Sequence, residues 1–164
     1  MNQKIQSLST LQKIRDRLRS EGRKVVFTNG CFDLLHGGHI YLFKEAKKRG
    51  DILIVAVNDD ASIRRLKGRT RPIFSLEERL EILDAVECID FLLSFSEDTP
   101  QRVISVLLPD VLVKGGDWKL AQVVGRMDVE GAGGEVVIIP YLKGWSTSEL
   151  LRRIRTSSQL VESR

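Results

Sequence analysis

The run DILIVAVN at residues 51–58 constrains the fold of this chain more than any other feature. Nearly every position in it is apolar. A strand of a parallel sheet that is covered on both faces has this near-continuous apolar character. A helical pattern precedes the run, and another apolar run precedes that helix at residues 25–27. Strand, helix and strand are therefore complete by Asn58, and the crossover between the strands should be right-handed.

Three more short apolar runs repeat this arrangement further along the chain, at residues 91–93, 111–113 and 136–139. Helical patterns or turns separate them. Short strands that alternate with helices are typical of parallel α/β proteins. We therefore expect a three-layer, Rossmann-like α/β fold, with a doubly wound parallel sheet of five strands.

Local signals place the helices. Apolar residues at helical spacing predict an amphipathic N-terminal helix over residues 10–19. Ser75 and Glu78 have the form of a capping box, and the helix that they open should run to about Val86. Thr99 is expected to be an N-cap, and Pro100 the first helical residue after it. Short helices are expected at 61–66 and 120–126, and a second capping box at 146–149 should open a final helix. The tail from residue 156 shows no pattern.

Length and composition predict one domain over residues 1–164, with a core over about 24–155. An apolar content of 42% and a charged content of 29% are ordinary for a soluble globular chain. No apolar run is long enough to span a bilayer, and no signal peptide is visible, so no membrane is expected. Two cysteines suggest no disulfide framework, which favours the cytoplasm. The net charge of +4 suits anionic small molecules and does not by itself indicate nucleic acid.

Residues 24–39, KVVFTNGCFDLLHGGH, join an apolar strand to a helix start through a glycine-containing turn. The first N–H groups of a helix lack intrahelical partners, and the helix dipole places partial positive charge there. His36 and His39 should share one face of that helix. Gly37 and Gly38 allow the backbone to approach a ligand. The stretch therefore predicts a phosphate cradle. A solvated helix start or a metal-binding histidine pair are the alternatives.

Polar residues follow the other strands as well. Asn58 and Asp59 follow the second strand, residues 114–118 follow the fourth, and residues 145–148 follow the fifth. In a doubly wound sheet the loops after the strands line one crevice. Helix starts at His39 and Ser146 would both face this crevice, and such an arrangement suits a triphosphate.

Residues 67–72 form a basic segment that follows the second strand and a short helix. Lys67, Arg69 and Arg71 are its cations, and Gly68 and Pro72 suggest a shaped loop rather than a merely solvated one. Since no acidic residue is near them in the sequence, we expect Lys67 and Arg71 to bind an anionic group.

Several common chemistries have no signature here. The chain has no GxxxxGK[ST] loop, no GxGxxG fingerprint and no GxSxG elbow. Cys31, His36 and His39 could be zinc ligands. A structural zinc site needs four ligands, however, and the remaining cysteine, Cys88, falls at a predicted helix end. We therefore expect no metal site built by the protein. The basic residues are spread along the chain without interleaved aromatic residues, which argues against an RNA-binding module.

HGGH at 36–39, WSTS at 145–148 and the segment from Arg71-Pro72 to Glu78-Arg79 together resemble the HxGH nucleotidyltransferase superfamily, the cytidylyltransferase-like group. The resemblance covers residues 24–153 and implies the strand order 3-2-1-4-5. It also implies that the two histidines contact the nucleotide phosphates and stabilise the transition state. In this superfamily a later basic residue reaches the phosphates, and here it matches Arg153 or its neighbour Arg152. Homodimers are common in the superfamily, although no interface signature stands out in the sequence.

The crevice and the resemblance together predict the site residues. The catalytic residues are His36, His39 and Lys67. Acceptor binding is expected from Asn58, Asp59, Lys67 and Arg71. Nucleotide binding is expected from Thr28, Asn29, Gly30, Phe32, Asp33, Gly38, Lys114, Gly116, Asp117, Trp145, Ser146, Thr147 and Ser148.

Within the superfamily, the segments NGCFDLLHGGH, VAVNDDASIRRLKGRTRP, EDTPQRVI and PDVLVKGGDW are most similar to the adenylyltransferases of ADP-heptose synthesis. That likeness implies transfer of AMP from ATP, with Mg²⁺ on its phosphates, to D-glycero-β-D-manno-heptose 1-phosphate, and release of pyrophosphate. Many such enzymes follow a sugar-kinase domain, and this chain is too short to hold one, so a stand-alone form is expected. The alternatives are a cytidylyltransferase acting on glycerol phosphate or a similar alcohol phosphate, and a non-catalytic nucleotide- or RNA-binding module.

Overall fold

The computed structural model of the chain describes residues 4–140, 142, 144–145 and 147–162. Within these residues, five strands form one parallel sheet in the order β3-β2-β1-β4-β5. This confirms the α/β class and the predicted strand order. The strands are β1 (Val25–Gly30), β2 (Ile52–Asn58), β3 (Phe91–Phe95), β4 (Val111–Gly115) and β5 (Glu135–Ile139).

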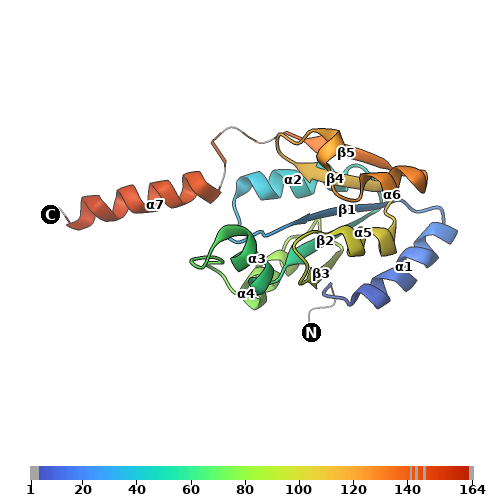
Figure 1. Ribbon diagram of the computed structural model, residues 1–164, viewed down its shortest axis with the longest axis horizontal. Helices are drawn as coiled ribbons and strands as arrows, with labels where there is room; N and C mark the ends of the chain where they lie inside the picture. The colour runs from blue at the N-terminus through green and yellow to red at the C-terminus, as the bar shows by residue number, and fades with distance from the viewer. Residues whose placement is uncertain (1–3, 141, 143, 146, 163–164) are drawn as a thin grey trace.

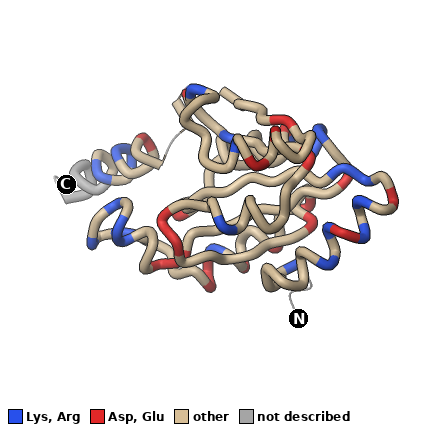
Figure 2. Tube along the Cα trace, turned by 45° about the vertical axis from the view of Figure 1, so that its right-hand side comes forward, with Lys and Arg blue, Asp and Glu red and all other residues tan. Residues whose placement is uncertain are grey.

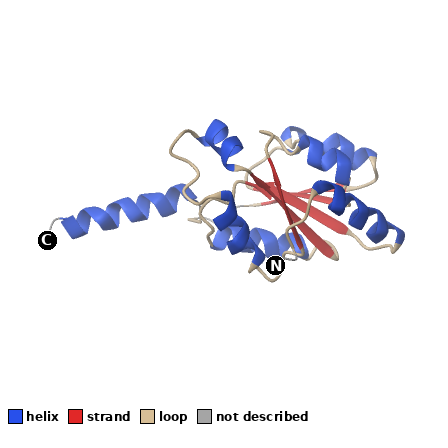
Figure 3. Cartoon of the chain, turned by 90° about the horizontal axis from the view of Figure 1, so that it is seen from below, coloured by secondary structure: helices blue, strands red, loops and turns tan. Residues whose placement is uncertain are grey.

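Helices cover both faces of the sheet (Figures 1 and 3). On one face, α1 (Leu8–Ser20), α5 (Gln101–Leu107) and α6 (Arg126–Gly131) contribute apolar side chains to a cluster with the sheet. On the other face, α2 (Gly37–Lys47) and α4 (Leu76–Asp84) contribute to a second cluster. All seven residues of β2 are buried, as its continuous apolar sequence predicts.

For three helices, the start that the sequence predicts can be compared with the N-cap in the structure. The capping box of Ser75 and Glu78 is present at the start of α4. Asp59 is the N-cap of α3 (Asp60–Lys67), where its carboxylate accepts a hydrogen bond from the Ser62 N–H. The prediction that Thr99 caps α5 is wrong, because Pro100 occupies that position and no side chain caps the helix.

The segment after β4 also differs from the prediction of one helix over 120–126. A short 3-10 helix, η1 (Leu120–Gln122), ends at Val123, and α6 begins only at Arg126. Gly125 separates the two with a φ of 82°, a left-handed conformation that no helix residue adopts. Val123 and Val129 on either side of this break are both buried against the same apolar cluster.

The two ends of the described chain hold features that the sequence pattern missed. Residues 4–6 lie along the edge of β3, where the Leu92 N–H donates to the Lys4 carbonyl and the Gln6 N–H donates to the Leu92 carbonyl. At the other end, the patternless tail is part of a helix, α7 (Thr147–Glu162), which projects from the body of the protein (Figure 1). No helix in the described part of the chain is long and apolar enough to cross a membrane.

Candidate active site

A cavity of about 550 Å³ lies where β1, β2 and β4 end. It brings together most of the residues that the sequence singled out, including both histidines. The predicted site residues that line it are Asn29, Gly30, Phe32, Asp33, His36, Gly38, His39, Asn58, Lys67, Arg71, Lys114, Thr147 and Ser148. The predicted residues Thr28, Asp59, Gly116, Asp117 and Trp145 do not line it, and Ser146 lies outside the described residues.

His36 and His39 form a stacked pair at the start of α2. Their ring centroids are 3.8 Å apart and the ring planes differ by 21°. His36 is the N-cap, and its Nδ1 accepts a hydrogen bond from the Gly38 N–H at 3.1 Å. A nitrogen that accepts this bond carries no proton, so the proton of the neutral His36 ring is on Nε2, where it can be donated to a ligand.

The histidine pair is neutral at physiological pH. Burial lowers the pKa of His36. It lowers the pKa of His39 further, to about 3, and the neighbouring His36 adds to the effect. The Nδ1 atom of His39 is buried and has no hydrogen-bond partner in the described part of the chain. Such an atom costs free energy unless a ligand or water satisfies it, so the pair is suited to contacting a bound anion as neutral hydrogen-bonding groups.

Lys114, near the end of β4, is one of the cations that line the cavity. Its Nζ donates to Oδ1 of Asn29 at 2.7 Å and lies 5.7 Å from the ring centre of Trp118. Burial lowers the pKa of Lys114 to about 8. The ammonium is still mostly protonated at pH 7, and its partial burial would strengthen its attraction for a phosphate.

Trp145 lies directly beside the histidine pair, although it does not line the cavity. A Cβ atom added to Gly37 would sit 1.8 Å from the Trp145 ring, and one added to Gly38 would sit 3.1 Å from the Trp145 carbonyl oxygen. In this structure the absence of a side chain at Gly37 allows the Trp145 ring to approach the backbone closely. The sequence analysis instead expected a ligand to approach the backbone there. The contact fixes the segment before α7 against the start of α2.

Lys67 and Arg71, which the sequence analysis predicts to bind the acceptor, both line the cavity. The expectation that no acidic residue lies near them is wrong for Arg71. Its Nε donates to Oδ2 of Asp33 at 2.5 Å. Asp33 comes from the turn after β1, far from Arg71 in the sequence, which is why the sequence did not reveal the pair.

Arg79 is the most important residue that the sequence analysis left without a role. Its side chain is fully buried, and it donates to the carbonyls of Cys31, Asn58 and Phe74 and to Asp60. An arginine on a helix is normally expected to be exposed to solvent. The only sequence feature that drew attention to Arg79 is its place in the segment from Arg71-Pro72 to Glu78-Arg79, which resembles the superfamily. Arg79 itself does not line the cavity. The lining includes residues that the sequence analysis did not select, among them Cys31, Tyr41, Asp98, Thr99, Trp118 and Gln122.

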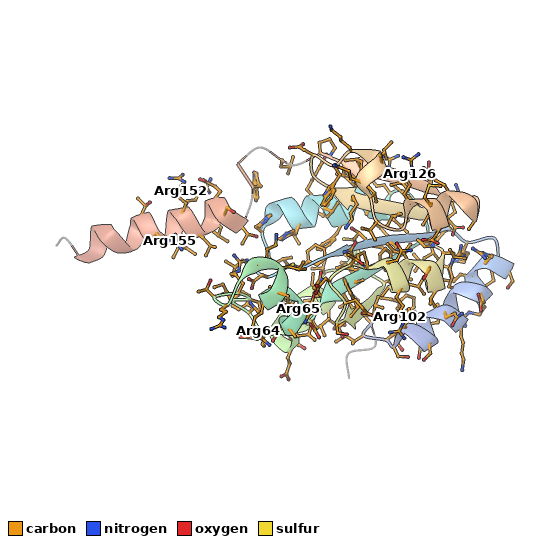
Figure 4. All side chains as sticks on the ribbon, in the orientation of Figure 1. Arg64, Arg65, Arg102, Arg126, Arg152 and Arg155 are labelled. Atoms are coloured by element: carbon orange, nitrogen blue, oxygen red, sulfur yellow. The ribbon has the colours of Figure 1, made fainter. Side chains whose placement is uncertain are left out.

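Lysines and arginines lie at both ends of the molecule (Figure 2). Figure 2 shows lysines and arginines on α7 and on α3 with the loop after it. Arg152 and Arg155 lie on the projecting helix α7 (Figure 4). Arg152 and Arg153, the candidates for phosphate contact, both donate to Glu149 and do not line the cavity. No group of three or more histidine, cysteine, aspartate or glutamate side chains that could hold a metal occurs among the residues searched, those that the structure describes.

The sequence profile of the cytidylyltransferase-like family matches residues 27–161, most of the chain. The chain therefore belongs to the cytidylyltransferase-like family, and this assignment makes it a nucleotidyltransferase.

The individual proteins that are similar to the chain include sequence relatives and solved structures. Proteins called bifunctional protein HldE are 51% identical to it, in Citrifermentans bemidjiense over 94% of the chain and in Enterobacter sp. (strain 638) over 86%. The chain spans only 32% and 30% of the length of these two relatives.

Solved structures agree with this assignment. A lipopolysaccharide core biosynthesis protein from Thermoplasma volcanium is 32% identical, with a TM-score of 0.60 over 74% of this chain and 98% of that one. Pantoate-β-alanine ligase from Francisella tularensis has a TM-score of 0.61 over 85% of this chain and 67% of that one, but only 18% identity, so it shows the shared fold alone.

Proposed function

We propose that the chain is an adenylyltransferase that moves AMP from ATP to a sugar 1-phosphate, D-glycero-β-D-manno-heptose 1-phosphate, and releases pyrophosphate. The observation that carries this proposal is the high identity to the HldE proteins over nearly the whole chain. The likeness of four segments to the adenylyltransferases of ADP-heptose synthesis supports it, as does the Thermoplasma relative named for lipopolysaccharide core biosynthesis.

In this reaction the acceptor phosphate attacks the α-phosphate of ATP, and the bond from that phosphorus to the β-phosphate oxygen breaks. A phosphate monoester is already a competent nucleophile, so the enzyme needs no activated serine or cysteine. Its contribution is to position the two phosphates and to stabilise the charge that develops between them.

In this proposal, ATP and the sugar phosphate are bound by different residues of the cavity. ATP lies on the β1 and β4 side, with its phosphates between the start of α2 and the Thr147 and Ser148 hydroxyls at the start of α7. The adenine is held largely by backbone groups near residues 113–114 and 145–147. The sugar phosphate lies on the β2 side, at Lys67 and Arg71. His36 and His39 donate to the α-phosphate as it becomes five-coordinate.

Magnesium enters this proposal as part of the substrate, MgATP. A triphosphate offers the hard oxygen ligands that Mg²⁺ prefers, and the ion commonly binds through phosphates with few protein ligands. When bound it would neutralise charge on the phosphates that leave. The protein residues around it would supply orientation through backbone N–H groups and hydroxyls.

Pyrophosphate release measured with ATP and with CTP, each against a panel of sugar and alcohol phosphates, tests the proposal. The expected result is turnover with ATP and heptose 1-phosphate. Turnover with CTP and glycerol phosphate would instead establish a cytidylyltransferase. Nucleotide binding without turnover of any acceptor would contradict an enzymatic role in this reaction.

A further inference from the structure

Asp33 holds the loop that carries the acceptor cations. Its side chain is buried, and its two oxygens face different parts of that loop. Oδ1 accepts hydrogen bonds from the backbone N–H groups of Ile73 at 2.7 Å and Phe74 at 3.0 Å. Oδ2 accepts from Nε of Arg71 at 2.5 Å. One carboxylate from the turn after β1 therefore binds three residues of the segment that joins α3 to α4.

This contact determines how Arg71 meets a ligand. A guanidinium group is planar, so a bond at Nε fixes the direction of its two terminal nitrogens. Neither terminal nitrogen has a partner in the described part of the chain, and the Arg71 side chain, 20% exposed, lines the cavity. Two adjacent free N–H donors suit the oxygens of a phosphate group.

Arg79 secures the far end of the same segment. Its Nε donates to the Phe74 carbonyl at 3.2 Å, and its Nη1 donates to the Cys31 carbonyl at 2.7 Å. Cys31 belongs to the same turn as Asp33. The loop is thus joined to the turn before α2 at two points, one through Asp33 and one through Arg79.

We propose that Asp33 is a positioning residue for the acceptor: it orients Arg71 and fixes the loop at 71–74 so that the acceptor phosphate is held in line with the nucleotide. The proposal rests on the proposed function, since it takes the acceptor to be a phosphate. It assigns Asp33 to the acceptor side, whereas the sequence assigned this residue to the nucleotide.

Steady-state kinetics of Asp33→Asn provide the first test. The amide keeps one oxygen for the two backbone N–H groups but loses the charge that holds Arg71. We expect KM for the sugar 1-phosphate to rise by about tenfold to a hundredfold, the effect of losing a charge-assisted contact, while KM for ATP stays near the wild-type value. Arg71→Lys, which cannot make both contacts, should show the same split.

Asp110→Asn is the matched control. Asp110 also accepts from an arginine, Arg15, and from a backbone N–H, that of Val25, but it does so at the opposite end of the sheet. It should lower stability and leave both KM values unchanged. A general loss of stability in Asp33→Asn would then be distinguishable from a change at the acceptor site.

Amide hydrogen exchange of the protein without substrates provides a test that needs no activity. In Asp33→Ala, the amides of Ile73 and Phe74 should exchange faster than in the wild type, while amides of β2 keep their protection. Unchanged exchange at both amides, or a KM increase confined to ATP, overturns the proposal. A wild-type protein that turns over no acceptor defeats the proposed function, but the exchange result still decides whether Asp33 holds the loop.

Discussion

The histidine pair is the residue-level feature on which the proposed chemistry most depends. Donors that strengthen toward the developing charge lower the barrier, and loss of one such donor costs on the order of 10²–10³ in rate. We therefore expect His36→Ala and His39→Ala each to lower kcat by about that factor, with a smaller change in KM for ATP. Turnover and melting temperature should be measured on the same preparations.

Ser75→Ala is a suitable control for His36→Ala, because it removes an N-cap outside the cavity. It should cost about 1 kcal/mol of stability and leave kcat near normal. A histidine variant that behaves in the same way, less stable but fully active, would show that the pair only caps the helix.

The low pKa of His39 predicts how stability depends on pH. In the unfolded chain a histidine titrates near 6.5, whereas His39 in the folded protein has a pKa of about 3. The unfolded state therefore binds more protons below pH 6.5. The free energy of unfolding is therefore unaffected by the titration of His39 above pH 6.5. As pH falls from 6.5 toward 3, protonation of this histidine in the unfolded state lowers the free energy of unfolding by roughly 1.4 kcal/mol per pH unit. Urea unfolding at pH 7 and 5.5 should show a smaller difference for His39→Asn than for the wild type.

Lys67 should act on the acceptor alone. Loss of a charge-assisted contact of about 1.5–3 kcal/mol corresponds to roughly ten- to a hundredfold in binding. Lys67→Ala is therefore expected to raise KM for the sugar phosphate by that factor, and KM for ATP much less. Arg69→Ala removes a cation from the same loop, outside the cavity lining, and should change neither value. An increase in KM for ATP alone would place Lys67 on the nucleotide.

Sequence reasoning selected cavity residues that belong to local patterns in the chain. The histidines and Lys67 belong to local patterns, and the structure brings them to one cavity. The roles of Asp33 and Arg79 depend on partners about 40 to 50 positions away, such as Ile73 for Asp33 and Cys31 for Arg79. No spacing rule reveals such partners, because a buried arginine on a helix has the same local sequence as an exposed one.

At the scale of elements, the contact between α2 and the segment before α7 is sensitive to a single methyl group. The Cβ of Gly37→Ala would overlap the Trp145 ring and must displace it. We expect KM for ATP to rise, since Thr147 and Ser148 come two and three positions after Trp145 in the sequence. Gly131→Ala, at a helical glycine with no atom within 4 Å of the added Cβ, is the control and should be neutral or slightly stabilising. Unchanged ATP kinetics in Gly37→Ala would separate Trp145 from nucleotide binding.

The elements themselves were predictable to different degrees. β2 was clear because a strand buried on both faces must be apolar throughout. The segment 120–126 was not, because the positive φ of Gly125 interrupts a pattern that is otherwise helical. The order of the strands came from the family resemblance, since periodicity within a strand contains no information about its neighbour.

For the whole molecule, the N-terminal segment covers the outer edge of the sheet. Removal of residues 1–6 would free the N–H and carbonyl groups of Leu92. An uncovered strand edge pairs readily with another chain. The shortened protein should therefore self-associate more strongly, as measured by sedimentation velocity. Lys4→Ala keeps the backbone pairing and should not associate more than the wild type. A shortened protein with unchanged sedimentation would contradict this role. The homodimer remains a prediction.

The chain contains two tryptophans, one in the lining of the cavity and one packed against Gly37 at the start of α2. Trp118 lines the cavity and is 47% exposed, and Trp145, 50% exposed, packs on Gly37 beside the histidine pair. Indole emission depends on contact with water, and a nucleotide that fills the cavity would change that contact for the Trp118 ring. We therefore expect tryptophan emission to report occupancy of the proposed nucleotide site, without a label and without turnover.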